Sequence, residues 1–108
     1  MIYHVLDKAV LELKLNHPAL RIALLQDYLS HANSDLTLLQ TAFEQQDEQR
    51  LKQLLITLQG TTSLVCAKPL EIALNTFKQQ PIQQHWESVA TLQAQLIDEL
   101  EHYLSEQA

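Results

Sequence analysis

A chain of 108 residues is long enough for one domain around one hydrophobic core. It carries 13 acidic residues against 7 lysines and arginines, and its net charge of −6 argues against nucleic acids and anionic membranes as partners, because both need a basic surface. Leucine, glutamine, glutamate and alanine dominate, so we expect an all-helical protein. The single cysteine, the lack of a signal-peptide layout and the lack of an apolar run of about 20 residues predict a cytoplasmic protein.

The first half of the chain predicts a short helix followed by a long one. The short helix runs from Ile2 to about Leu13 and should bury Val5, Leu6, Ala9, Val10 and Leu13. Asn16 is a good N-cap for the long helix, which we expect from about His17 to Gln46. Its apolar residues keep one phase throughout, so we predict a continuous helix that buries Ile22, Leu25, Leu29, Ala32, Leu36, Leu39 and Phe43.

Asp47 should cap a third helix that ends near Val65 to Ala67. Its apolar face consists of Leu51, Leu54, Leu55, Leu58, Thr62 and Val65. At about 100° per residue, Ile56 points about 150° away from the centre of this face. Gly60, the only glycine of the chain, follows one turn later on the same outer side, where it costs about 1 kcal/mol relative to alanine. An exposed isoleucine beside bare backbone predicts a docking surface.

Two further helices complete the predicted fold. A shorter helix after Pro69 should bury Leu70, Ala73, Leu74 and Phe77. The last, from Pro81 to about Ser105, should bury Ile82, Val89, Leu92, Leu96, Leu100 and Tyr103 or Leu104, with Trp86 along one edge. Because the connections are short, we expect one domain over residues 1–108: an up-down bundle of four helices with the short N-terminal helix across one end.

Motifs for catalysis and for cofactor binding are missing from the sequence. It contains no glycine-rich phosphate loop, no metal-spaced Cys/His cluster and no nucleophile elbow, so we expect neither enzymatic activity nor a bound cofactor or metal. We interpret the histidines as ordinary surface or boundary residues: His4, His17, His31, His85 and His102. Asp98 lies one turn before His102 and could pair with it. Cys66 has only Lys68 as a basic neighbour in sequence, which disfavours a reactive thiol.

The segment from Leu55 to Gly60, followed by small residues and the pair Cys66-Ala67, resembles the histidine-containing phosphotransfer (HPt) domain. HPt domains are the intermediate carriers of bacterial multistep phosphorelays, and their central motif is Ala-His-x-Leu-Lys-Gly, with a Gly-Ala pair after it. The resemblance covers nearly the whole chain, and Leu58, Gly60 and Ala67 fit the motif.

Three positions depart from the HPt pattern. Ile56 occupies the place of the phosphoacceptor histidine, Gln59 that of the lysine, and Cys66 that of the first glycine of the pair. Isoleucine has no nucleophilic atom, so Ile56 cannot be phosphorylated, and Gln59 carries no charge. In the family, the glycine one turn beyond the acceptor keeps the approach clear for a receiver domain, and Gly60 matches that glycine.

We therefore hypothesise a pseudo-HPt domain of a two-component phosphorelay, which docks on the receiver domain of a response regulator or hybrid kinase without accepting phosphate. The residues expected to contact the receiver are Lys52, Ile56, Gln59, Gly60 and Ser63. Two alternatives stay open. One is a structural, remnant or oligomerising domain of a hybrid sensor kinase. The other is phosphotransfer through a different histidine, for which His31 would be the closest substitute.

Overall fold

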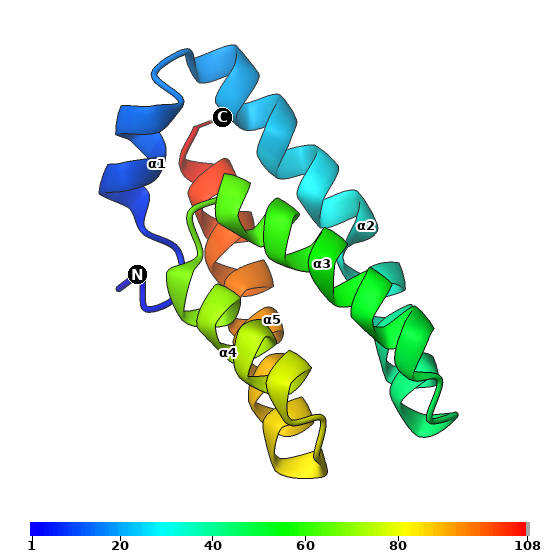
Figure 1. Ribbon diagram of the computed structural model, residues 1–108. Helices are drawn as coiled ribbons and strands as arrows, with labels where there is room; N and C mark the ends of the chain where they lie inside the picture. The colour runs from blue at the N-terminus through cyan, green and yellow to red at the C-terminus, as the bar shows by residue number, and fades with distance from the viewer. Residues whose placement is uncertain (108) are drawn as a thin grey trace.

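The computed structural model describes residues 1–107, which form five α-helices and no β-strand. They are α1 (Lys8–Lys14), α2 (Pro18–Glu44), α3 (Glu48–Leu64), α4 (Lys68–Gln79) and α5 (Gln83–Glu106), as Figure 1 shows. From α2 onward each helix packs against the next and runs in the opposite direction, and α5 returns against α2. The predictions of an all-helical chain and of a continuous second helix are confirmed. None of the helices in this range is long and apolar enough to cross a membrane.

The core lies between α2, α3, α4 and α5. The predicted stripes of the last three of these helices supply most of it, namely Leu51, Leu55, Leu58, Thr62, Leu70, Leu74, Phe77, Val89, Leu96, Leu100 and Tyr103. Phe43, Phe77 and Trp86 form an aromatic cluster, with ring centroids 5.1 Å apart for Phe43–Phe77 and 5.8 Å apart for Phe77–Trp86. Trp86 is therefore part of the core, because its ring packs among these aromatic side chains.

The buried face of α2 is rotated from the predicted one. Leu25, Ala32 and Leu39 are buried as expected, but Tyr28 is also buried and Leu36 is only half-buried. The rotation is possible because polar groups find partners inside: the Tyr28 hydroxyl donates to Gln93 Oε1 of α5 at 2.8 Å. A pattern of apolar residues alone does not reveal such a pair.

Two helix starts and one side-chain pair differ from prediction. The N-cap of α2 is His17, whose Nδ1 accepts the Leu20 N–H at 3.3 Å, so the assignment of this role to Asn16 was wrong. The start of α5 is Gln83, because Ile82 is extended and serves as the N-cap. His102 pairs with Glu106 at 2.9 Å instead of with Asp98. The prediction that Asp47 caps α3 is confirmed by its bond from the Arg50 N–H.

The N-terminal segment departs furthest from the prediction. Helix α1 begins only at Lys8, after an Asp7 cap, and the residues before it are not helical. Val5 and Leu6 are buried as predicted, whereas Val10 and Leu13 are exposed and Leu11 is buried in their place.

A buried carboxylate on α5 explains the path of this segment. Glu99 is fully buried and accepts three consecutive backbone N–H groups, from His4 at 3.2 Å, Val5 at 3.0 Å and Leu6 at 2.8 Å. Gln95 donates to the same carboxylate at 2.8 Å. Burial acts to raise the pKa of Glu99, but these hydrogen bonds outweigh it and lower the pKa below its usual value. The negative charge of Glu99 thus holds the N-terminal segment on the bundle.

Glu99→Gln should lower the free energy of unfolding by about 2–4 kcal/mol, because the amide turns an N–H group toward backbone donors and removes the charge. Urea unfolding at neutral pH measures the effect, and Glu101→Gln, at an exposed position of the same helix, is the control. Since the folded-state pKa is lowered, the stabilisation by Glu99 is present above the pKa of the unfolded chain and is lost as the pH falls through the folded-state value. The difference in free energy of unfolding between the unaltered protein and Glu99→Gln should therefore become smaller below about pH 4. An equal stability at neutral pH would contradict this role.

Two helices end with a non-glycine residue in the left-handed conformation. Gln46 (φ 57°) follows α2 and Cys66 (φ 60°) follows α3. Both belong to Schellman motifs: the Gln46 N–H donates to the Phe43 carbonyl at 3.1 Å and the Asp47 N–H to the Ala42 carbonyl at 3.0 Å, and the bonds after α3 follow the same pattern. Glycine adopts this conformation without strain, so the chain tolerates a local penalty at both positions.

Gln46→Gly should stabilise the protein by about 0.5–1 kcal/mol, because it removes left-handed strain at an exposed position. The change in the urea midpoint tests it. Gln46→Ala keeps the Cβ and is the matched control, for which little change is expected. If Gln46→Ala raised the free energy of unfolding as much as Gln46→Gly, relief of backbone strain would not be the cause of the stabilisation.

Candidate functional site

The five residues predicted to contact a partner lie on the side of α3 that faces away from the core. We call this set, Lys52, Ile56, Gln59, Gly60 and Ser63, the α3 outer face. It points outward because the leucine stripe of the same helix is buried against α2 and α4. Ile56 is 60% exposed, and only Gln59 is half-buried among the others. The sequence prediction of an exposed isoleucine at this position is confirmed.

Gly60 leaves the backbone bare beside Ile56. A Cβ added to it would meet no atom within 4 Å, and its φ is not positive. Neither packing nor backbone conformation therefore requires glycine here. Leu64, one turn further along, is 54% exposed and was not included in the prediction. The spacing of Ile56, Gly60 and Leu64 by four residues each could have revealed it, since these positions form one row along a helix.

One edge of the α3 outer face adjoins α4 and the N-terminal segment. The Gln59 amide donates to Asn75 Oδ1 of α4 at 3.5 Å. Ser63 lines a shallow hollow of mixed charge together with Asp7, Val10, Lys14, Cys66, Lys68 and Glu71. Burial raises the pKa of the Cys66 thiol, which favours its protonated form over the thiolate. This edge therefore offers hydrogen bonds and charges of both signs.

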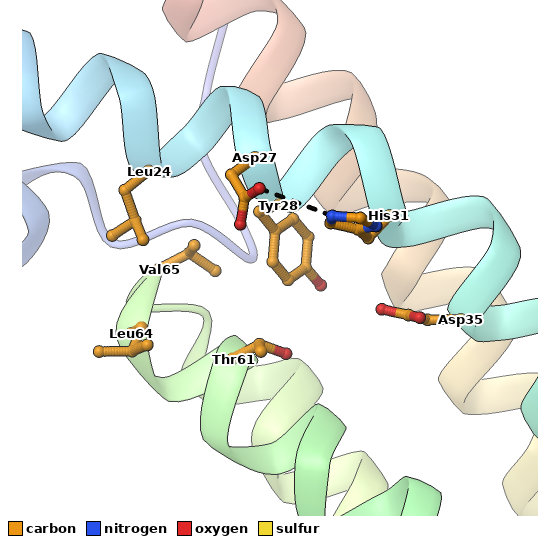
Figure 2. A pocket seen from close by; sticks show the side chains of 8 residues that line it. All are labelled: Leu24, Asp27, Tyr28, His31, Asp35, Thr61, Leu64 and Val65. Carbon is orange, nitrogen blue, oxygen red and sulfur yellow. Dashed lines mark ion pairs between the residues drawn. The ribbon is translucent and has the colours of Figure 1, made fainter.

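The other edge borders a groove between α2 and α3, which Figure 2 shows from close by. We call it the α2–α3 groove; it encloses about 130 Å³ and is lined by Leu24, Asp27, Tyr28, His31, Asp35, Thr61, Leu64 and Val65. Leu64 thus belongs both to the exposed row on α3 and to the groove. His31 lies on the α2 side, with its Nε2 3.6 Å from Asp27 Oδ1.

The histidines do not restore a phosphoacceptor to the α3 outer face. His17 caps α2, His85 Nδ1 contacts the Gln80 carbonyl at 2.8 Å, and His102 contacts Glu106. His4 precedes α1 and His31 lies across the groove on α2. Within residues 1–107, no three His, Cys, Asp or Glu side chains are grouped to hold a metal ion. The centre of the face is instead the hydrocarbon side chain of Ile56, which has no atom that can accept a phosphoryl group.

Comparison of the chain with protein-family models, with curated proteins and with solved structures finds no match. The interpretation of the α3 outer face therefore rests on its own residues and on the arrangement of the helices that carry it.

Gly60→Ala should raise the free energy of unfolding by about 1 kcal/mol, because alanine favours the helix and its methyl group meets empty space. Thermal or urea unfolding measures the gain. Gln53→Ala, at an exposed position of the same helix, should change stability by only a few tenths of a kcal/mol. If Gly60→Ala were neutral or destabilising, the fold itself would need the glycine.

Proposed function

We propose that this chain is a pseudo-HPt domain, a non-enzymatic binding module that docks on a receiver domain without carrying phosphate. The observation that carries the proposal is the pairing of a well-exposed Ile56 with the open backbone at Gly60 on one face of α3. A receiver partner also implies a cytoplasmic location, because the resemblance is to a carrier of cytoplasmic phosphorelays.

The helix arrangement supports the proposal. Each of α2 to α5 packs against its neighbour in sequence and α5 closes on α2, which we interpret as the up-down four-helix bundle of an HPt domain with α1 added at the N-terminal side. Of the residues that match the HPt motif, Leu58 and Gly60 lie on α3 and Ala67 is the N-cap of α4, and the acceptor position lies on the outward side of α3. An approaching domain thus meets Ile56 where an HPt carrier would present histidine.

The chemistry of Ile56 indicates what the module does once docked. An isoleucine has no atom that can accept a phosphoryl group, so the module would bind the receiver without removing the receiver's phosphoryl group. Covering the exposed part of an isoleucine contributes about 1–2 kcal/mol, and the bare backbone at Gly60 allows close approach. Such a module would act as a decoy, a tether or an allosteric regulator of the receiver.

The exposed row on α3 also favours a second candidate, an oligomerising domain. Ile56 and Leu64 are both more than half exposed, and two copies could cover them by packing against each other. Sedimentation equilibrium separates the candidates. A dimer that Ile56→Glu dissociates would support self-association, and a monomer at high concentration would count against it.

Ile56→Glu combined with Gly60→Gln should weaken receiver binding at least about tenfold, because it places a charge and a long side chain where apolar contact is expected. Calorimetric titration with purified receiver domains from the same genome measures the change. Ile72→Glu is the matched control, because Ile72 is an isoleucine of similar exposure, 56%, that lies on α4 and faces a hollow between α4 and α5.

Three results would contradict the proposal. Unchanged receiver affinity of the double variant would remove the α3 outer face from the interface, and absence of binding to every receiver would favour a scaffold role. Formation of acid-labile phosphohistidine after incubation with a phosphorylated receiver would instead establish transfer through one of the five histidines.

A further inference from the structure

The floor of the α2–α3 groove is apolar and already folded. Leu24 and Tyr28 from α2 face Leu64 at the end of α3 and its C-cap Val65, and Figure 2 shows the Tyr28 ring in the space between the two helices. The Tyr28 hydroxyl donates a hydrogen bond to Gln93 Oε1 at 2.8 Å, so the groove presents the ring rather than the hydroxyl. Burial raises the pKa of Tyr28, which keeps the side chain neutral. The floor therefore suits hydrocarbon.

The rim of the groove is negatively charged. Asp27, His31 and Asp35 follow one another at four-residue steps along α2, so the two carboxylates lie about 12 Å apart along the helix axis. The Asp27 carboxylate lies beside His31 Nε2, and the side chains of Asp27 and His31 are well exposed, at 72% and 64% respectively.

In the part of the chain that the structure describes, no lysine or arginine pairs with this rim, and the basic group beside Asp27 is His31. Within residues 1–107, the recorded ion pairs involve histidine only, and neither aspartate meets a lysine or arginine. The one arginine of α2, Arg21, is buried and donates to the Leu15 carbonyl. Apolar walls with uncompensated carboxylates attract cations and repel anions.

We infer that the α2–α3 groove receives an amphipathic, basic helix of a partner protein. Its arginines or lysines, two helical turns apart, meet Asp27 and Asp35, and an apolar residue between them rests on Tyr28, Leu24 and Leu64. Long basic side chains suit this groove because their hydrocarbon stems cover the floor while the charged heads reach the rim. The inference is separate from the proposed receiver docking, since its charged residues come from α2 and Ile56 takes no part.

The test uses the full chain and a defined probe. The probe is an acetylated, amidated peptide on an alanine and glutamine background, with two arginines eight residues apart and two leucines between them on the same helical face. In a ¹H–¹⁵N titration we expect shifts centred on Leu24, Asp27, His31, Thr61 and Leu64. The affinity should fall with added salt and drop about tenfold in Asp27→Asn/Asp35→Asn. Glu44→Gln/Glu48→Gln, two exposed acids near the α2–α3 connection, should bind like the unaltered chain.

Several results would overturn the inference. If a control peptide with glutamates in place of the two arginines bound with the same affinity, the binding would be non-specific apolar contact. Equal affinity of the Asp27→Asn/Asp35→Asn variant, shifts centred elsewhere, or absence of binding would each remove the groove as a basic-helix site. Ile56→Glu should bind the peptide normally even where it abolishes receiver binding, so the failure of one proposal is distinguishable from the failure of the other.

Discussion

The burial of one leucine stripe fixes what this protein presents to its surroundings. Leu51, Leu55 and Leu58 are nearly or fully buried between α2 and α4, which sets the rotation of α3 about its own axis. Once that rotation is set, Ile56 and Gly60 have to lie outside, because helical geometry leaves them on the opposite side. The candidate docking face is thus a direct consequence of core packing.

A buried carboxylate fixes the position of the N-terminal segment, just as hydrophobic packing fixes the rotation of α3. Glu99 takes the N–H groups of His4, Val5 and Leu6, and the Asp7 N–H adds a bond to the Cys66 carbonyl at 2.9 Å. These bonds place the segment over the connection between α3 and α4. The hollow beside Ser63 exists because of this placement, since Asp7, Val10 and Lys14 form one of its walls.

The sequence predicted the apolar faces of α3, α4 and α5 well, but it missed the rotated face of α2 and the buried polar residues. Helix periodicity gave all the long helices and the exposure of Ile56, because burial of a leucine stripe is a local property of each helix. Helix periodicity could not predict that Glu99, Gln93 and Arg21 are buried, because their burial depends on hydrogen-bond partners that lie far away in the chain or outside the helix. The short helix was placed too early for the same reason: its apolar residues fit a helix, but Glu99 holds their backbone in another path.

Leu64 connects the two candidate surfaces and shows why they are best considered together. It ends the exposed row that begins at Ile56, and it also forms a wall of the α2–α3 groove. Exposed apolar area gives no stability to the free domain, and Gly60 weakens the helix by about 1 kcal/mol without relieving any contact. Covering that side of α3 would remove the exposed parts of Ile56 and Leu64 from water. The two candidate surfaces differ in chemistry: the side chain at the centre of the α3 outer face is the uncharged Ile56, whereas the rim of the α2–α3 groove carries Asp27 and Asp35, which favour basic residues and exclude acidic ones.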